Sequence, residues 1–377
     1  MLVAAVAAPA AAQAQMGAAA GRALSSSGMP VRALARLATR KAATKSKSGK
    51  ASAKAEDTLV IEGAGDGHGV GMSQWGALGY AEHGWSASAI LGHYYTGTTL
   101  GHVSEKDIVK VLVGSHVEKV PIEAYVRGVV AAEMPASWPA AALQAQAIAS
   151  RTYALTADAG GSRFDVYSDT RSQVYLGKAG ETPQSNAAVK ATAGEIVTYE
   201  DQPAITFFFA SSGGMTEDIQ NVFLGSLPEP WLTSVSDPYD GGPLHRWKAS
   251  ARFAEVAKQL SGLVKGSFEG IEVLKRGISP RVLSADVLGS KGRTEVSGPE
   301  LAERLGLYST WVYFSVLSPN GTVKREPDAS GQQRPAETTT EEAPPSTTPP
   351  PPASPEAGSN GGTTTPAAQA GGGAGAP

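Results

Sequence analysis

Glu133 is the residue in this sequence whose type and setting best suit acid–base chemistry. It ends the run VVAAE, and the Met134-Pro135 pair that follows stops a helix, with Trp138 close behind. Partial burial against such apolar neighbours disfavours the charged carboxylate and raises its pKa. A general acid that acts on a glycosidic oxygen needs a carboxyl group of this kind. Taken alone, however, a glutamate at the end of a helix is more often solvated.

Other familiar catalytic arrangements are absent from the sequence. The serines of the central region have neither the S-x-x-K nor the G-x-S-x-G context of common acyl-transfer nucleophiles, and no H-E-x-x-H motif occurs. The chain has six histidines without compact ligand spacing and no cysteine, which excludes disulfides and thiolate metal sites. We therefore expect neither a metal nor a cofactor, since these histidines hold a metal only through long-range assembly.

Residues 65–77, GDGHGVGMSQWGA, place five glycines around a single histidine, His68. Glycine is used where the backbone takes a positive φ angle or approaches another group closely. The stretch is therefore either a tight turn with a buried histidine, or a bare backbone that a ligand approaches, with His68, Ser73 and Gln74 as hydrogen-bonding groups. The same two interpretations apply to the small residues after the FFFA run, namely Ser211, Ser212, Gly213 and Gly214.

These residues are expected to lie on an α+β framework of mixed helices and antiparallel sheet. β-branched or alternating runs predict strands at 59–61, 108–114, 195–200, 204–211, 310–317 and within 268–296. Capping and proline signals predict helices over 73–82, from Ser86 or Ser88 to about 95, over 121–133, from 137 onward and over 252–260. The runs at 195–200 and 204–211 are expected to form a hairpin. The order lacks regular βαβ alternation, which favours one α+β domain, either continuous or with a small inserted α/β subdomain near 245–306.

Composition divides the chain into four segments. Residues 1–16 resemble a signal peptide, and residues 17–56 form a basic arm with nine Lys/Arg that is expected to be disordered. Residues 57–324 are expected to form the folded domain, and residues 325–377, rich in Pro, Thr and Gly, a disordered tail. Residues 55–324 carry 21 Lys/Arg against 29 Asp/Glu, which argues against nucleic acid as a partner. We expect export, and contact with a membrane that is peripheral at most.

Four motifs together resemble the stage II sporulation protein D/LytB family. They are VPIEAYVRGVVAAEMPASWPAAALQAQAIASRTYAL (120–155), SQVYLG (172–177), ASSGGMTE (210–217) and the opening GDGHGVGMSQWGALGYAEHG (65–84). The resemblance covers nearly all of residues 57–317. It implies a secreted lytic transglycosylase of the cell wall that cuts the MurNAc–GlcNAc glycan strands of peptidoglycan, with the family's catalytic glutamate at Glu133.

The implied chemistry needs one carboxyl group, whereas ordinary glycosidases use two. Glu133 donates its proton to the leaving oxygen and then accepts the proton of the muramic acid C6 hydroxyl, which attacks the anomeric carbon and closes a 1,6-anhydro ring. Arg151 either contacts the sugar or pairs with an acid in the core, and Trp75 and Trp138 either stack on sugars or pack in the core. The residues expected to bind the glycan are His68, Ser73, Gln74, Gln146, Arg151, Gln173, Tyr175, Ser211, Ser212, Gly213 and Gly214.

The sequence departs from the family pattern in two respects. Ser172 precedes Gln173 where a zinc-binding cysteine is common, so we expect no zinc site and a loop held by hydrogen bonds instead. The GHGVG motif commonly closes the domain and here opens it, as in a circular permutation. If the two ends of the domain meet, Leu59–Ile61 pairs with part of Trp311–Val316.

Two alternatives remain beside the enzyme. One is a non-catalytic enhancer that binds wall glycan or a cell-wall amidase, which would then be a partner. The other is a structural wall-binding module with the terminal segments as spacers.

Overall fold

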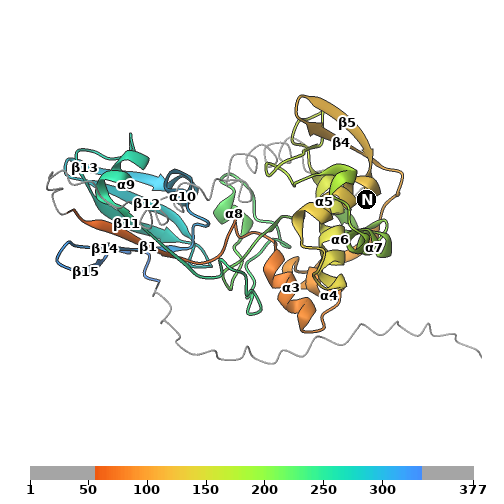
Figure 1. Ribbon diagram of the computed structural model, residues 1–377, viewed down its shortest axis with the longest axis horizontal. Helices are drawn as coiled ribbons and strands as arrows, with labels where there is room; N and C mark the ends of the chain where they lie inside the picture. Colours follow the sequence, from red (N-terminus) through yellow and green to blue (C-terminus); the bar gives the residue numbers. More distant parts are fainter. Residues whose placement is uncertain (1–55, 333–377) are drawn as a thin grey trace, which may run out of the picture. The chain divides into compact units, whose positions relative to one another are not determined.

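The computed structural model of the chain describes residues 56–332 (Figure 1). The predicted signal-like segment, almost all of the basic arm and most of the predicted tail lie outside these residues. The described residues form two hydrophobic cores, which we call the helical core and the sheet core. As predicted, the fold is α+β, with helices and mainly antiparallel strands.

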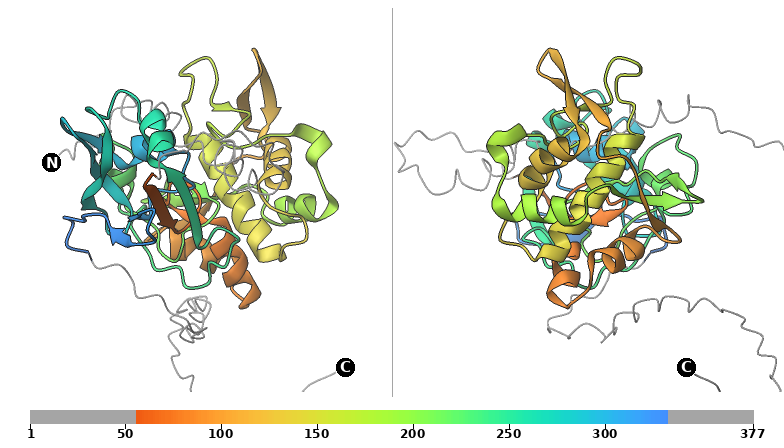
Figure 2. Two further views of the ribbon diagram at one scale, coloured as in Figure 1. Left: turned by 60° about the vertical axis from the view of Figure 1, so that its left-hand side comes forward. Right: turned by 90° about the vertical axis from the view of Figure 1, so that its right-hand side faces the viewer.

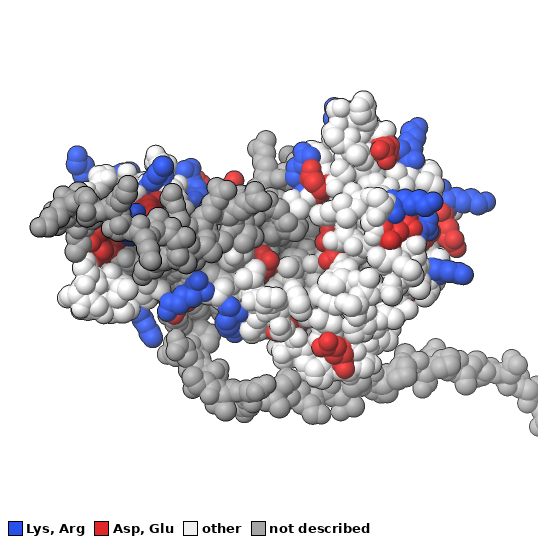
Figure 3. Space-filling model, in the orientation of Figure 1, with Lys and Arg blue, Asp and Glu red and all other residues white. Residues whose placement is uncertain are grey.

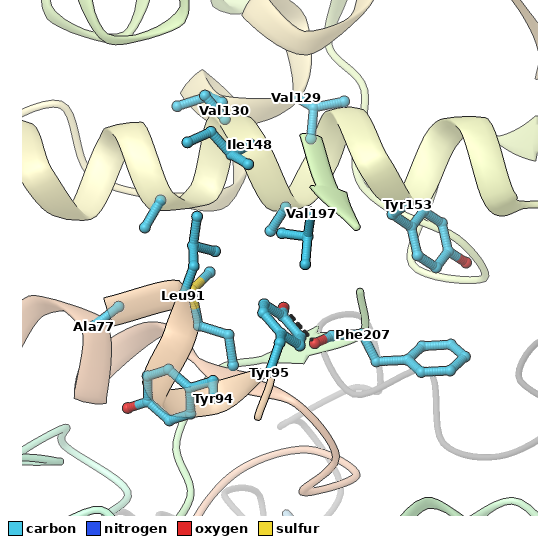
Figure 4. Packing of buried hydrophobic residues seen from close by; sticks show 14 of the residues in the cluster. Ala77, Leu91, Tyr94, Tyr95, Val129, Val130, Ile148, Tyr153, Val197 and Phe207 are labelled. Carbon is cyan, nitrogen blue, oxygen red and sulfur yellow. Dashed lines mark hydrogen bonds between the residues drawn. The ribbon is translucent and has the colours of Figure 1, made fainter. Parts of the chain in front are cut away.

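Helix α6 (Ala140–Thr156) forms the centre of the helical core. Its residues from Ala145 to Ala154 are all buried, and its alanines leave room for neighbouring elements to approach closely. In Figure 4, Val129 and Val130 lie beside Ile148 of α6, while Leu91, Tyr94 and Tyr95 pack below it. The helices grouped around α6 are α3 (Gln74–Glu82), α4 (Ala87–Tyr94), α5 (Ile122–Glu133) and α7 (Pro183–Ala191) (Figure 1).

Small sheets border these helices. One has the order β5-β4-β6, and the β4–β5 hairpin projects beyond the helices in Figure 2. The others have the orders β3-β7-β8 and β2-β9. Their strands are β2 (Met72–Ser73), β3 (Thr99–His102), β4 (Ile108–Val113), β5 (His116–Pro121), β6 (Val166–Tyr167), β7 (Glu195–Tyr199), β8 (Gln202–Pro203) and β9 (Phe208–Phe209), and the short helices η2 (Gly177–Gly180) and α8 (Ile219–Val222) lie between strands.

The sheet core combines both ends of the described chain. Strand β1 (Thr58–Gly63) lies between β10 (Trp247–Arg252) and β14 (Val312–Leu317), and β14 also pairs with β15 (Val323–Arg325). Leu59 pairs with Val316 and Ile61 with Phe314, which confirms the predicted pairing of these segments. The permutation that suggested this pairing stays a prediction. A second sheet and two helices complete the core: β11 (Phe268–Arg276), β12 (Val282–Gly289), β13 (Gly292–Ser297), α9 (Phe253–Gln259) and α10 (Gly298–Leu305).

The predicted hairpin of 195–200 and 204–211 is wrong in its second strand. Only Gln202–Pro203 returns along β7 as a paired strand. Beyond it, the Thr206 hydroxyl donates to the Ala149 carbonyl at 2.8 Å, and the Phe207 carbonyl accepts from Met72 N at 3.0 Å and from the Tyr95 hydroxyl at 2.9 Å. After Ala204, whose N–H still donates to Val197 of β7 at 3.0 Å, the polar groups of Thr206 and Phe207 are therefore satisfied by α6, β2 and Tyr95.

The folded region also extends beyond the predicted boundary at residue 324. The Glu326 side chain accepts from Ile271 N at 2.7 Å, Val273 N donates to the Pro327 carbonyl at 3.0 Å, and Asp328 pairs with Arg276 at 2.9 Å. These contacts attach residues 326–328 to β11. On the face shown in Figure 3, described basic and acidic side chains are interspersed.

The Gly-rich stretch passes a buried arginine of the sheet core. Arg281 is fully buried, and its guanidinium donates to the carbonyls of Met215 and Ser212, each at 2.9 Å. Gly69 has φ +92°, and a Cβ there would lie 2.5 Å from the Arg281 Cζ atom. Glycine at 69 is therefore required by both the backbone conformation and the guanidinium that lies against it.

We predict that Gly69→Ala destabilises the protein more than Gly84→Ala. Gly84 also has a positive φ, +84°, but a Cβ there meets no atom within 4 Å. Gly84→Ala should lower the free energy of unfolding by about 1 kcal/mol through backbone strain alone, and Gly69→Ala by about 1–3 kcal/mol more because Arg281 must move. Urea unfolding of both variants measures the difference. Equal losses would show that Arg281 does not constrain residue 69.

Candidate active site

Three segments hold the carboxyl group of Glu133. Glu133 is the last residue of α5 and is partly exposed. Its Oε2 atom accepts a hydrogen bond from Gln74 Nε2 at 3.0 Å, and its Oε1 atom accepts one from Val174 N at 2.8 Å. Each oxygen thus has one fixed donor and retains a lone-pair direction for another group.

Burial raises the pKa of the Glu133 carboxyl above its usual range, and the hydrogen bonds from Val174 and Gln74 act in the opposite direction. The charge of the Glu133 carboxylate also acts on two nearby tyrosines. Burial raises the pKa values of Tyr125 and Tyr153, and the nearby Glu133 carboxylate contributes to both shifts. The net effect is a raised pKa for the Glu133 carboxyl group, whose carboxylate form keeps two N–H donors.

A chain of buried amides fixes the position of Gln74. Gln74 Nε2 also approaches Gln146 Oε1 at 3.4 Å, and Gln146 Nε2 donates to the Ser150 hydroxyl at 2.9 Å. Gln173 Nε2 donates to the Ser150 carbonyl at 3.1 Å. The structure thus brings three predicted site residues together with Glu133. The side chains of Gln146 and Gln173 are buried, so in this structure they hold the neighbouring residues Gln74 and Val174 in place beneath the surface.

Tyr175 helps to place the Val174 N–H group. Its ring stacks on Tyr125 with a centroid distance of 5.1 Å, and Leu176 N donates to the Gly128 carbonyl at 3.2 Å. A Cβ at Gly128 would lie 2.6 Å from the Tyr175 ring. The bare backbone of α5 at this point therefore lets the 172–176 segment approach Glu133.

Two predicted site residues have other partners. His68 Nδ1 accepts from Val70 N, its Nε2 donates to the Phe208 carbonyl, both at 3.1 Å, and burial lowers its pKa to about 4. Arg151 is fully buried and binds Glu123 through Nε at 2.7 Å and Nη2 at 2.8 Å. His68 is thus a neutral residue with both ring nitrogens bonded, and Arg151 forms the core ion pair that was its alternative interpretation. Sugar binding by either residue stays a prediction.

The loop of Ser211–Gly214 is organised by the buried carboxylate of Asp240. Asp240 Oδ2 accepts from the Ser211 hydroxyl at 2.8 Å, the Ser212 hydroxyl at 3.2 Å and Gly213 N at 2.6 Å. Gly214 N donates to the Ser212 hydroxyl at 2.9 Å. Both serines are buried, so in this structure their hydroxyls stabilise the loop, and their contact with a sugar stays a prediction.

Ser73 links this loop to the site. Its hydroxyl accepts from Gly76 N at 3.1 Å as the cap of α3 and from Ser212 N at 3.3 Å. Gln74 is the first residue of α3, so the Ser73 cap fixes the backbone position from which the Gln74 side chain reaches Glu133. Ser73 is fully buried, so here it acts through position.

Several residues at the site were not identified from the sequence. They are Tyr125, Tyr153, Ser150, Asp237 and Asp240. Tyr125 lies two turns before Glu133 on α5, and Ser150 lies one turn after Gln146 on α6. This helical spacing could have identified both residues from the sequence. Asp237 and Asp240 lie in the turn-like run SDPYDGG, where exposed aspartates are common. The local sequence therefore did not indicate that these two side chains are buried.

The residues present do not fit the zinc site of some family members. The Ser172 hydroxyl accepts from Tyr167 N at 3.1 Å and so holds the loop by hydrogen bonding, as expected. Within residues 56–332, no group of three or more His, Cys, Asp or Glu side chains is arranged to hold a metal. In the same residues, no helix combines the length and apolarity needed to cross a bilayer.

Comparisons with known proteins agree with these motifs. The family model described as stage II sporulation protein matches residues 114–199, which include Glu133, α6 and Val174. Stage II sporulation protein D of Bacillus subtilis is 33% identical over 212 residues, which are 51% of this chain and 60% of that protein. The same-named protein of Bacillus amyloliquefaciens is 31% identical over 211 residues, again 51% of this chain and 60% of that protein.

A further relative carries a different name. The amidase enhancer of Bacillus subtilis is 37% identical over 114 residues, which are 30% of this chain and 15% of that protein. The chain thus spans three-fifths or less of the length of these relatives.

We predict that Gln74→Leu raises the pKa of Glu133 further. Leucine has a similar size but removes the N–H donor that favours the carboxylate. Titration of the Glu133 side-chain carbon by NMR measures the change. Gln146→Leu is the comparison variant, and it should give a smaller rise because only the support of Gln74 is lost. An unchanged or lower pKa in Gln74→Leu would show that this hydrogen bond does not act on Glu133.

We also predict that Asp237→Asn removes a pH dependence of stability. Asp237 is fully buried, it accepts from the Tyr94 hydroxyl at 2.8 Å, and burial together with the charge of Asp240 raises its pKa from 3.8 to about 7. Between these values the folded protein holds a proton that the unfolded chain releases. Stability therefore falls as pH rises from about 4 to about 7 and is level above that range.

In the asparagine variant this loss should disappear. The free energy of unfolding of the variant relative to the original protein should rise across that window by as much as about 4 kcal/mol. Urea unfolding at a series of pH values gives the difference. A difference that is independent of pH would contradict the raised pKa of Asp237.

Proposed function

Because the chain belongs to the stage II sporulation protein D/LytB family, we propose that it is an exported peptidoglycan lytic transglycosylase with Glu133 as its acid and base. The amidase-enhancer relative supports a function connected with the cell wall. The observation that carries the proposal is the carboxyl group of Glu133, which has a raised pKa and fixed N–H donors on both oxygens.

The proposed reaction uses this one carboxyl group twice. Burial keeps Glu133 protonated to higher pH, so that it donates a proton to the glycosidic oxygen as the bond to the anomeric carbon breaks. The carboxylate formed is stabilised by Gln74 and Val174. It then accepts the proton of the C6 hydroxyl of MurNAc, whose oxygen bonds to the anomeric carbon and closes the 1,6-anhydro ring.

The local electrostatics suit a one-carboxyl mechanism. Within the described residues, the causes that shift the pKa of Glu133 are burial and two hydrogen bonds, with no contribution from a second carboxyl group. A two-carboxyl glycosidase would place a second acid on the other side of the bond to act as base or nucleophile. The one-carboxyl mechanism therefore rests on the proposed membership of Glu133 in the family's reaction, and the causes of its pKa shift are consistent with it.

The second candidate function is a non-catalytic, glycan-binding enhancer of a cell-wall amidase. The matched segment of the amidase enhancer favours it. An enhancer needs neither a raised pKa at Glu133 nor paired donors around its carboxylate. These features favour the enzyme.

The test is digestion of purified peptidoglycan glycan strands by the chain and by Glu133→Gln. Glutamine keeps the shape but can neither donate a carboxylic proton nor take one back, so turnover should fall about 100-fold or more. Mass spectrometry measures release of 1,6-anhydro-MurNAc ends. Glu105→Gln, at an exposed glutamate, is the control and should cleave normally.

Near-normal turnover in Glu133→Gln would remove Glu133 from the reaction. If the original protein releases no anhydro products but stimulates an added amidase, the enhancer function replaces the enzyme.

A further inference from the structure

Two tryptophans close in sequence to the residues around Glu133 contact each other. The ring centroids of Trp75 and Trp138 are 5.0 Å apart, with an angle of 61° between the ring planes. Trp75 directly follows Gln74, whose amide binds Glu133, and Trp138 stands five residues after Glu133 in the turn before α6. Both side chains are partly exposed. The aromatic pair thus joins the residue after Gln74 to the turn that follows Glu133.

The pair is held firmly. Trp75 N donates to the Ala210 carbonyl at 2.9 Å, and Trp138 N donates to the Pro135 carbonyl at 3.0 Å. The indole of Trp75 also lies against the backbone of Gly242, where a Cβ would come within 2.6 Å of the ring. These contacts hold both backbones and the Trp75 ring in place before any ligand arrives.

The indole N–H groups of this pair are available to a ligand. Trp231 Nε1 donates to the Ile205 carbonyl and Trp247 Nε1 to the Gly65 carbonyl, each at 2.9 Å. Within residues 56–332, neither the Trp75 nor the Trp138 indole N–H has a hydrogen-bond partner, and neither is among the fully buried unpaired groups. A partly exposed indole with a free N–H offers both an apolar face and a donor.

We propose that Trp75 and Trp138 form a stacking site for an N-acetylated sugar ring of the glycan strand, next to the ring on which Glu133 acts. The C–H face of a pyranose lies on the indole, and the indole N–H groups donate to hydroxyl or acetamido oxygens of the sugar. The site rests on the proposed function, because it places the strand so that a glycosidic oxygen reaches Glu133. Trp75 and Trp138 position the substrate and take no part in proton transfer.

The first test needs no change in the pair. Indole N–H signals are recorded by NMR in the Glu133→Gln protein as a MurNAc–GlcNAc tetrasaccharide is added. The signals of Trp75 and Trp138 should shift, and that of Trp247, whose N–H is already bonded, should stay. If the tetrasaccharide binds and neither signal of the pair shifts, the stacking site is wrong.

The second test measures affinity and kinetics. Trp138→Leu should weaken tetrasaccharide binding about tenfold or more and raise KM more than it lowers kcat. Trp138→Phe should lie between Trp138→Leu and the original protein because it keeps a ring. Trp85→Leu is the matched control in the same core and should bind normally.

The outcomes separate this inference from the proposed function. Normal binding and cleavage by Trp138→Leu would overturn the stacking site and leave the transglycosylase intact. Loss of cleavage in Glu133→Gln with binding that depends on Trp138 would support both. If the original protein neither binds nor cleaves the tetrasaccharide or longer strands, both proposals fail.

Discussion

The burial of α6 is the constraint on which the rest of the helical core depends. From Ala145 to Ala154 this helix is buried, so each polar side chain in that stretch must find a partner inside the protein. Arg151 pairs with Glu123, the Thr152 hydroxyl accepts from Val197 N at 2.9 Å, and Gln146 extends the amide chain to Gln74. The partners of α6 thereby fix α5, β7 and the start of α3, and with them both sides of Glu133.

Buried polar groups also find partners inside the protein where the sheet core meets residues 211–217, SSGGMTE. The Glu217 carboxylate is fully buried and accepts from Ile278 N at 3.1 Å and Ser279 N at 3.0 Å, while Arg281 binds carbonyls of the same segment. Removing a single partner would leave a buried charge unpaired, which costs far more than a surface contact. Because Ser212 also contacts the cap of α3, the geometry at Glu133 depends on residues far from it in sequence.

Glu133 combines two opposed influences. Burial favours its neutral form, and the donors Gln74 and Val174 favour its charged form. Burial is the larger influence and the pKa is raised, and in the proposed reaction the two donors stabilise the carboxylate that forms when the proton is given up. The donors come from two segments that α6 holds in place through Gln146 and Ser150, so little rearrangement is needed when the charge develops.

The sequence by itself determined the elements with strong local signals. The cap at Ser73, the helix that ends at Glu133 and the pairing of Leu59–Ile61 with β14 are present as predicted. Of the two serines that the sequence offered as the start of the next helix, Ser86 is the cap, and the long helix predicted from 137 begins at Ala140. Periodicity, capping and chemical type are properties of a few neighbouring residues, and a sequence displays them directly. The four motifs identified the family for the same reason.

Only the tertiary structure decided which partner each buried polar group has. The sequence allowed His68, Arg151, Ser211 and Ser212 to be ligand-binding or structural, and folding gave them Phe208, Glu123 and Asp240 as partners. The hairpin expected after β7 ended at Pro203 because α6, β2 and Tyr95 offered hydrogen bonds to the next residues. Such choices depend on contacts between residues up to about 140 positions apart, and local patterns carry no record of them.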